Sequence, residues 1–592
     1  MDTTRPHQAI SNHEYDANHS ISFDPSAYTH GKPKLGRVSS SSTVTVTNVS
    51  ATTSVRSVPV SRSSSHDDLQ RNLYASVRSQ VLPGHDCNKN DSSVTIQGRE
   101  SKDSLPESGH VKWYPPPLPD PNLYLVDFDG PDDPIHAQNW PMKKKVLTTA
   151  MLAVTTMISV FTSSIFSTAI SAVANQYNVS TEVGILGLSL FVLGFAFGPI
   201  FWAPISELKG RRLIIVWSGL GFSIFQVGTA VAKDLQTILL CRFWGGIFGA
   251  APLAVVGAVF VDIYDNRTRG IAMTIFAMVV FIGPLIAPVI GGFITNSSLG
   301  WRWIQWLAAI LGITCFFINL FFLEESFAPA ILAAKAAKIR QKTRNWAIHA
   351  KHEEIEMNLW ELFSGYFSRP IQMLFKEPII FLISVYMSFI YGLLYLFLTA
   401  YPVVFQGIHG MPPGISGLPY FGMITGVIIA GIFVVLVQPS YNRKLMANKN
   451  VTVPEWRLPP MMVGSVAFAI GVFWFAWSGH TSSIHWIIPT LSGLLTGFGL
   501  LIIFIQSLNY IIDAYIMYAA SALAANSLLR FLAGAIFPLF SRTLFNTLGI
   551  NWSCTILGCI ATILVPIPII FYYFGHRIRA RSSYGLQFEK EH

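Results

Sequence analysis

The 592-residue chain is poor in charge, since only 12% of its residues are Asp, Glu, Lys or Arg while 51% are hydrophobic. Soluble globular proteins carry about 25% charged residues. Cysteine is also scarce, with five residues at positions 87, 241, 315, 554 and 559. So few cysteines cannot form a disulfide framework, and none lie at zinc-ligand spacing. These shortages argue against a soluble enzyme and a disulfide-stapled secreted domain, and they indicate a protein of the lipid bilayer.

Motifs for ATP-driven or catalytic chemistry are missing as well. The chain has no Gly-x-x-x-x-Gly-Lys-Ser/Thr phosphate loop, no Ser/His/Asp grouping, no His-rich metal cluster and no dinucleotide fingerprint. We therefore expect no enzymatic activity, no catalytic residue, no metal site and no cofactor. Uphill movement of a solute would have to draw on an ion gradient.

The first 112 residues contain few apolar clusters and hold serine runs at 39–42 and 63–65. Such a segment buries too little apolar surface to offset its ordering entropy, so we predict a disordered Ser-rich cytosolic tail on which kinases could act. It lacks a basic stretch followed by an apolar core, and we expect no cleavable signal peptide. A Pro-rich linker and a pre-helix segment follow at 113–145.

Long apolar blocks make up most of the remaining chain, and twelve of them reach the roughly 20 residues that a membrane-spanning helix needs. The blocks cover 146–174, 183–204, 213–232, 235–261, 271–295, 301–323, 378–401, 416–438, 459–478, 484–507, 513–540 and 549–574. A cytosolic insert at 324–377, with a Lys/Arg-rich helical stretch at 333–344, divides them. The pattern predicts an all-α membrane protein whose twelve transmembrane helices form two six-helix bundles, 146–323 and 378–574, before a cytosolic tail at 575–592. Twelve spans in two sixes are typical of a secondary transporter whose binding site lies at mid-membrane.

Basic residues are unevenly distributed over the polar connections. If the N-terminus is cytosolic, the inner connections and the C-terminal tail hold 24 Lys and Arg residues, and the outer connections hold three. Basic residues near span ends stay on the cytosolic side, so we predict that both termini are cytosolic. The net charge of +9 then reflects topology and contact with the lipid bilayer, and no nucleic acid partner is needed to explain it. Asn178, Asn296 and Asn551 would face outward as glycosylation candidates, although all three lie close to the membrane.

The connection between the second and third spans, residues 203–212, resembles the signature Gly-x-x-x-Asp-Arg-x-Gly-Arg-Arg of the major facilitator superfamily. The corresponding residues are Gly210, Arg211 and Arg212, with Glu207 in place of the aspartate. Ala203 and Leu208 depart from the pattern. A glycine permits a tight reversal, and the charged side chains can pair with helix ends. The resemblance implies an inner latch between conformations; the alternative is a simple positive-inside anchor.

The fourth span carries Arg242, followed by Gly245, Gly246 and Gly249. A charge at a helix centre costs about 2.5–3.5 kcal/mol on insertion scales, so we expect Arg242 to face a partner or a watery cavity. Alternatively it snorkels outward, since it lies only about 10 Å along the helix. The segment resembles the superfamily's fourth-span motif, which implies a role of the arginine in proton coupling.

The fifth span contains two prolines four residues apart within a glycine-rich stretch. Its motif residues are Gly283, Pro284, Pro288, Gly291 and Gly292. The prolines remove helix hydrogen bonds on one face, and the glycines allow close packing there. The stretch resembles the antiporter-branch motif Gly-x-x-x-Gly-Pro-x-x-Gly-Gly, with Ala287 in place of one glycine. This resemblance implies transport in the export direction.

Further blocks make the resemblance more specific. They lie at 129–134 and 139–141, at 301–303 and 324–329, and at 509–515 and 519–526. Together they resemble the fungal twelve-spanner drug:proton antiporter family, particularly its polyamine and multidrug exporters, over about residues 123–580. The resemblance implies a monomeric plasma-membrane protein that exports drugs, toxins, secondary metabolites or polyamines, with the vacuolar membrane as the less favoured location.

Proton coupling needs a group whose pKa responds to burial, and no His, Asp or Glu lies in the middle of a predicted span. The coupling candidates are Asp262 at the inner end of the fourth span and Asp513 at the start of the eleventh, opposed by Arg242 and Arg530. Glu207, Glu324 and Glu325 at inner helix ends are further acidic candidates. Each acid can also be an ordinary helix-end charge.

The substrate cavity should be apolar with a few polar groups. Candidates are Thr156, Ser159 and Ser163 on one face of the first span, Tyr386, Tyr391 and Tyr395 on the seventh, and Tyr510 and Tyr515 near the eleventh. Aromatic faces suit lipophilic or cationic compounds, although helix packing explains each residue equally well. The lack of mid-membrane carboxylates argues against a dedicated polycation site.

These observations predict a proton-coupled exporter of a small-molecule substrate that works by alternating access of two bundles. Two alternatives are an importer of the same fold and a non-transporting sensor that signals through its cytosolic tail.

Overall fold

The computed structural model describes residues 124–265, 268–354, 359–449, 451–580 and 582. The predicted tail at 1–112 and most of the linker lie outside the described residues. Within the described ranges the chain is helical, and its only β-type pairing is a parallel bridge between Leu125 and His349. The all-α expectation is confirmed.

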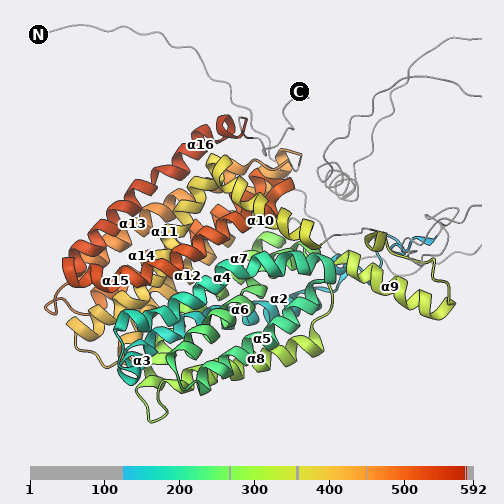
Figure 1. The fold of residues 1–592 in the computed structure, drawn as a ribbon. Coiled ribbons are helices and arrows are strands. Elements are labelled where there is room, and N and C mark those ends of the chain that lie inside the picture. The colour runs from blue at the N-terminus through green and yellow to red at the C-terminus, as the bar shows by residue number, and fades with distance from the viewer. Residues whose placement is uncertain (1–123, 266–267, 355–358, 450, 581, 583–592) are drawn as a thin grey trace, which may run out of the picture. The chain divides into compact units, whose positions relative to one another are not determined.

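The first half of the chain forms six crossings, shown from blue to green in Figure 1. The first crossing consists of α2 (Met142–Ile165), a 3₁₀ turn (Phe166–Ala169) and α3 (Ile170–Tyr177). The others are α4 (Thr181–Lys209), α5 (Arg211–Val231), α6 (Leu235–Ile263), α7 (Arg269–Thr295) and α8 (Arg302–Phe322). The predicted span at 183–204 is too short, because α4 continues beyond Pro204. Only Gly210 separates it from α5, so the expected polar connection is largely helical.

The insert at 324–377 also contains helices. Helix α9 (Ala328–Thr343) covers most of the predicted basic stretch, and α10 (Leu359–Lys376) leads into the second half. Proline near its first turn starts α9, and Arg344 ends it in the left-handed conformation with φ 53°.

The second half begins with α11 (Pro378–Pro402), which a π-helical turn (Val403–Ile408) extends. The helices that follow are α12 (Tyr420–Ala447), α13 (Leu458–Ser478), α14 (Ile487–Ala514), α15 (Ala519–Leu564) and α16 (Pro566–Arg579). The expectation that Asp513, Tyr510 and Tyr515 belong to the eleventh span is wrong. Helix α14 continues to Ala514, so Asp513 and Tyr510 lie at the end of the tenth.

Among the described residues, eleven continuous helical stretches are long and apolar enough to cross a membrane. The last of them, Ala519–Arg579, has 61 residues. A helix of that length would extend about 90 Å, roughly three times the hydrocarbon thickness of a bilayer. Gly549 divides it, because its φ of 72° and ψ of 169° are not helical and suit only a residue without a side chain. The division yields the twelve crossings that the sequence predicts.

Two helix pairs join the bundles: α4 packs on α15, and α7 packs on α12 (Figure 1). Aromatic rings strengthen the first contact and add a third contact, between α7 and α14. Phe195 of α4 meets Phe531 of α15 with ring centroids 5.6 Å apart. Phe281 of α7 meets Phe504 of α14 at 4.7 Å. These contacts enclose the centre of the helical region, where the polar residues described below lie.

Candidate functional site

Arg242 of α6 is completely buried, with no exposed surface. Its guanidinium donates three hydrogen bonds to backbone carbonyls: Nε to Gly187 at 2.9 Å, Nη1 to Thr162 at 3.0 Å and Nη2 to Ser163 at 3.1 Å. The ring of Phe191 lies 4.1 Å from its central carbon. Arg242 therefore does not snorkel outward. It ties α6 to α2 and α4 inside the first bundle.

Arg530 of α15 occupies a buried position in the second bundle, and 7% of the residue is exposed. Its environment is almost entirely aromatic. The guanidinium carbon lies 4.6 Å from the ring of Phe531, 4.8 Å from that of Phe504 and 5.2 Å from that of Tyr391. A hydrogen bond from Nη2 to Ser527 Oγ is long, at 3.3 Å, and Nε has no partner among the described residues. Arg530 is therefore a buried cation with most of its donors unused.

A chain of hydroxyl groups lies between the two arginines. The Ser163 hydroxyl of α2 is 2.7 Å from the Tyr395 hydroxyl of α11, and the Tyr391 hydroxyl donates to Tyr395 at 3.5 Å. Ser163 also accepts from Arg242 through its carbonyl, while Arg530 lies over the Tyr391 ring. The structure thus brings together three predicted cavity residues and both predicted coupling arginines. The row of hydroxyl groups between the arginines extends from the first bundle to the second.

A small cavity adjoins this central chain. Its volume is about 10 Å³, roughly the space that one water molecule needs. Its lining residues are Phe281, Met387, Ile390, Tyr391, Leu500, Ile503 and Phe504. Binding sites for drug-sized molecules span roughly 300–1,000 Å³. A compound of that size therefore fits here only if the helices around the cavity move apart.

The other predicted cavity residues lie elsewhere. The Thr156 hydroxyl bonds to Leu152 O of its own helix, and Ser159 lines a second cavity inside the first bundle. Tyr386 is buried on α11. Tyr510 stacks on Phe571 of α16, and Tyr515 donates to Glu377 Oε2 at 2.9 Å. The last two tyrosines therefore belong to the inner end of the second bundle, the end that we predict to face the cytosol.

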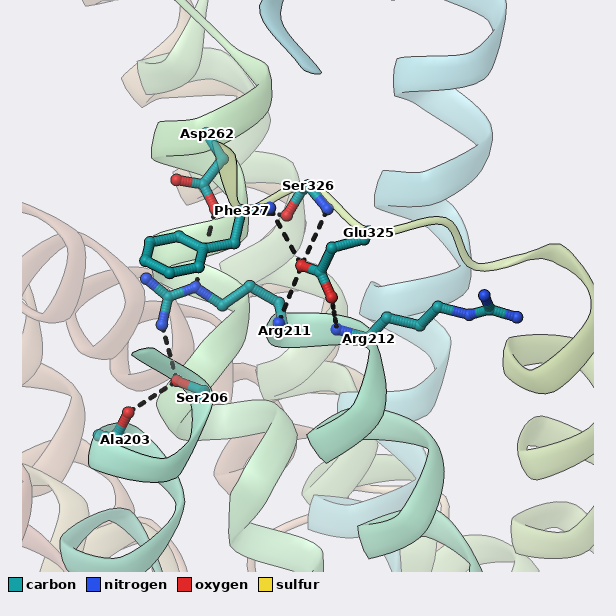
Figure 2. Close-up of polar contacts among 8 residues, drawn as sticks. All are labelled: Ala203, Ser206, Arg211, Arg212, Asp262, Glu325, Ser326 and Phe327. Carbon is teal, nitrogen blue, oxygen red and sulfur yellow. Dashed lines mark hydrogen bonds and ion pairs between the residues drawn. The ribbon is translucent and has the colours of Figure 1, made fainter. Parts of the chain in front are cut away.

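Glu325 organises the inner end of the first bundle (Figure 2). Its carboxylate accepts the backbone N–H groups of Arg211 at 2.9 Å and Arg212 at 3.0 Å, the first two residues of α5. It also accepts those of Ser326 and Phe327. The first N–H groups of a helix lack partners within the helix and attract negative charge. Glu325 therefore fixes the start of α5 to the end of α8.

Gly210 is required at this point for two reasons. Its φ of +93° strains any residue with a side chain, and a Cβ would lie 2.4 Å from Glu325 Oε2. The glycine thus permits both the sharp turn from α4 to α5 and the close approach of the carboxylate.

The Arg211 guanidinium completes this group, named here the Arg211 cluster. Nη1 donates to Ser206 Oγ at 2.6 Å, Nε lies 3.7 Å from Asp262 Oδ2, and the Phe327 ring lies 4.7 Å from the central carbon (Figure 2). Arg212 instead donates to the Leu320 carbonyl. Within the described ranges, Glu207 makes no hydrogen bond or ion pair. The acid that holds the arginine backbones is Glu325, which follows the sixth span and was expected only as a coupling candidate.

Asp513 occupies a similar position at the inner end of the second bundle. Its Oδ2 accepts from Arg457 Nε at 3.0 Å and from the Tyr441 hydroxyl at 3.3 Å. We call these three residues the Asp513 cluster. Beside it, Glu455 forms an ion pair with Arg579 of α16. Arg457, Glu455 and Arg579 were not among the predicted site residues, although acids and bases near helix ends were a usable signal.

The glycines of the predicted antiporter motif lie where α7 meets its neighbours. A Cβ on Gly283 would lie 2.9 Å from Met157 O of α2, and one on Gly291 would lie 2.6 Å from Thr168. On Gly292 it would lie 2.5 Å from Pro413 O, in the segment before α12. Pro284 and Pro288 are buried within the same helix. The motif therefore shapes a helix that touches both halves of the chain.

The glycosylation candidates lie at helix ends. Asn178 follows α3 with φ 51°, Asn296 follows α7, and Asn551 comes two residues after the break at Gly549. By chain order, each lies at the end of the bundles opposite the Arg211 cluster.

The chain is similar to transporters over most of its length. The family model of the Major Facilitator Superfamily matches residues 152–538. Multidrug transporter FLU1 of Candida albicans is 44% identical over 502 residues, which cover 84% of this chain and 82% of that protein. Multidrug transporter TPO1_2 of Candida glabrata is 45% identical over 481 residues, covering 81% and 83%. Uncharacterized transporter C36.03c of Schizosaccharomyces pombe is 48% identical over 470 residues, covering 79% and 87%.

Solved structures share the fold. The proton:xylose symporter XylE bound to 6-bromo-6-deoxy-D-glucose superposes with a TM-score of 0.54 at 16% identity, covering 74% of this chain and 96% of that chain. The partially occluded inward-open conformation of XylE from E. coli has a TM-score of 0.52 at the same identity, covering 72% and 97%. The expected arrangement of two six-helix bundles is confirmed by this likeness.

Proposed function

Because the chain belongs to the major facilitator superfamily and is a multi-pass membrane transporter, we propose that it exports small organic compounds from the cytosol in exchange for protons. Drugs, toxins and secondary metabolites are the compounds that we expect. The export direction is supported by two relatives named multidrug transporters, each at least 44% identical, and by the glycine and proline pattern of α7.

The observation that carries the proposal is the polar contact between the bundles at Ser163 and Tyr395, beside a small cavity. A drug-sized solute can bind there only when the bundles move apart. Movement at one end while the other stays closed is alternating access, which places the binding site between the two halves.

Asp262 and Asp513 are our candidates for coupling this movement to protons. Each carboxylate lies at an inner helix end and forms an ion pair with an arginine, Arg211 or Arg457. A proton on the carboxylate removes its charge and so weakens the ion pair. Proton binding would therefore loosen the helix ends at one side of the transporter, and proton release would restore the contacts.

We further propose a plasma-membrane location with both termini in the cytosol and a monomeric state within the lipid bilayer. The Arg211 and Asp513 clusters would then form the cytosolic side of the protein. An accessibility assay with epitope tags on the two termini in intact and permeabilised cells tests this orientation directly.

Transport is tested in inside-out vesicles that contain the full-length protein. Energised by an acidic interior, the vesicles should accumulate neutral and charged aromatic compounds from a panel, and a protonophore should abolish the accumulation. Uptake that continues after collapse of the proton gradient and follows ATP would refute proton exchange. An importer would instead accumulate compounds only in right-side-out vesicles. A non-transporting sensor would accumulate none in either kind of vesicle.

A further inference from the structure

The strongest unexplained feature of the central site is the unsatisfied guanidinium of Arg530. A guanidinium has five N–H donors and no acceptor. Arg530 uses one of them, in a 3.3 Å hydrogen bond to Ser527, although 93% of the residue is shielded from solvent. Buried charges without partners are costly, and fixed aromatic rings compensate only in part. A ligand that brings acceptor atoms would complete this environment.

Arg242 provides the contrast within the same molecule. Three of its five N–H groups donate to backbone carbonyls at 2.9–3.1 Å, and every one of its nitrogen atoms has a partner. The two arginines thus have the same side chain but donate different numbers of hydrogen bonds. Among the described residues, Arg530 has one hydrogen bond against three for Arg242, and its buried Nε has no partner.

The surroundings of Arg530 define what that partner must be. Arg530 lies directly behind the lining of the central cavity, because two of the rings that contact its guanidinium, Tyr391 and Phe504, line that cavity while Arg530 itself does not. The remaining lining side chains are apolar. No Asp or Glu belongs to the described lining, and the described residues offer Arg530 no ion pair. A bound cation would therefore meet positive charge without a counter-ion.

We propose that the central site binds organic anions, with a carboxylate held by Arg530 and an apolar or aromatic body held by Tyr391, Phe504 and Phe281. A carboxylate matches the planar fork of a guanidinium and can accept two parallel hydrogen bonds from it. The substrate class is thus aromatic carboxylates rather than polyamines. This inference rests on the proposed function, because it specifies the compounds that the exporter carries.

The test compares three probes with one carbon skeleton: 4-phenylbutanoate, 4-phenylbutanamide and 4-phenylbutylamine. Their uptake is measured in inside-out vesicles that contain the full-length protein under a fixed proton gradient. Since charge-assisted hydrogen bonds are about twice as strong as neutral ones, we expect the carboxylate to be taken up about tenfold faster than the amide. The amine should be the slowest of the three.

Variants of Arg530 then assign the preference to this residue. Within the Arg530→Gln variant, carboxylate and amide should be taken up at equal rates, so the ratio of the two rates falls from about ten to about one. Arg530→Lys keeps the charge but loses the two-point geometry, so it should retain an intermediate preference. The size-exclusion profile and thermal unfolding report whether each variant is folded.

The outcomes separate the two proposals. Uptake of all three probes at equal rates, or fastest uptake of the amine, refutes the anion site while the exporter proposal stands. The same conclusion follows if Arg530→Gln keeps the carboxylate preference. If no probe and no compound of the wider panel is transported, the proposed function itself is wrong. If Arg530→Gln does not fold, the order of the uptake rates of the three probes in the unaltered protein still decides whether the site prefers anions.

Discussion

The two bundles each contain one buried arginine, yet the two side chains have opposite hydrogen-bonding situations. Arg242 donates three hydrogen bonds to carbonyls of α2 and α4. Arg530 rests on aromatic rings and makes one long hydrogen bond. A buried arginine can therefore be part of the scaffold or an open binding group, and the number of its satisfied donors distinguishes the roles. In this protein the first bundle uses its arginine for stability, and the second leaves its arginine available.

The inner ends of the bundles show a second contrast on a shared plan. In each half a basic residue at the start of one helix pairs with an acid near the end of the next, Arg211 with Asp262 and Arg457 with Asp513. The additional contacts differ. Glu325 binds the N-terminus of α5 through backbone N–H groups, whereas the second half uses a side-chain ion pair between Glu455 and Arg579. Similar charge patterns thus fasten different helices.

The largest expected effect comes from the matched variants Arg242→Gln and Arg530→Gln. Hydrogen bonds from a charged group contribute about 1.5–3 kcal/mol each, so Arg242→Gln should lower the free energy of unfolding by ~3 kcal/mol or more. Arg530→Gln removes an unpaired buried charge and should be neutral or stabilising. Thermal unfolding of the detergent-solubilised proteins measures both. Equal destabilisation by the two variants would contradict the comparison.

Neutralising the acids at the inner ends should have the next largest effect. Asp513→Asn removes a 3.0 Å ion pair, and Asp262→Asn removes a 3.7 Å pair, while both carboxylates are largely buried. The shorter pair should contribute more, so we expect losses of about 2 and about 1 kcal/mol. Thermal unfolding measures the stability, and vesicle uptake at several proton gradients measures the coupling. Unaltered gradient dependence in both variants would remove these acids as coupling groups.

Glu325→Ala should produce a loss of stability no larger than that of Asp513→Asn, and the neighbouring Glu324→Ala is its natural control. Glu325 caps α5, and removing a helix cap costs about 1–2 kcal/mol. The side chain of Glu324 is 63% exposed and pairs with Lys144, so its removal should cost less than about 1 kcal/mol. Cysteine labelling at the start of α5 would report the loosened helix end. Equal labelling of the two variants would show that Glu325 does not hold it.

The smallest predicted effect concerns the segment outside the bundles where residues 124–126 pair with His349. Both ring nitrogens of His349 face acceptors, Ala347 O at 2.7 Å and Glu354 Oε1 at 2.8 Å. The Ala347 carbonyl and then the Glu354 carboxylate raise the pKa of His349, and Glu353 adds to the effect. The stabilisation that the charged His349 imidazole gives to this segment is fully present below the ordinary histidine pKa of about 6.5. It is lost as pH rises through the higher pKa of His349 in the folded protein.

Hydrogen exchange at the backbone amides of Val126 and His349 measures this contact. We expect their protection to fall severalfold above the raised pKa, in addition to the normal dependence of exchange on pH. His349→Gln should abolish that extra change, and His352→Gln should leave it in place. A protection that stays constant in the unaltered protein would refute the role of the charged imidazole.

Much of the fold follows from apolar block lengths alone. The predicted sixth span, 301–323, agrees with α8 to within one residue at each end, as does 459–478 with α13. Block length cannot locate a helix end that is itself polar. Helix α14 therefore continues through Asp513, whose carboxylate accepts hydrogen bonds from Arg457 and Tyr441, and α4 continues to Lys209, which is exposed.

The candidate site was only partly predictable. Arg242, Arg530, Ser163, Tyr391 and Tyr395 could be identified as unusual polar residues of apolar spans. The sequence could not show which acid contacts the backbone of Arg211. Glu207 lies four residues away in sequence, whereas Glu325, which makes the contact, lies 114 residues away. Contact between such distant residues depends on how α5 and α8 pack, and that arrangement has no local signal.

The sequence by itself determined that this chain crosses a membrane repeatedly, since apolar blocks of helical length have no other stable environment. It also determined which few charges the membrane must accommodate. Only the tertiary structure decided which partners surround each charged side chain. Hydrogen bonds act over about 3 Å, so the packing of separate helices gave Arg242 its three carbonyls and left Arg530 among aromatic rings.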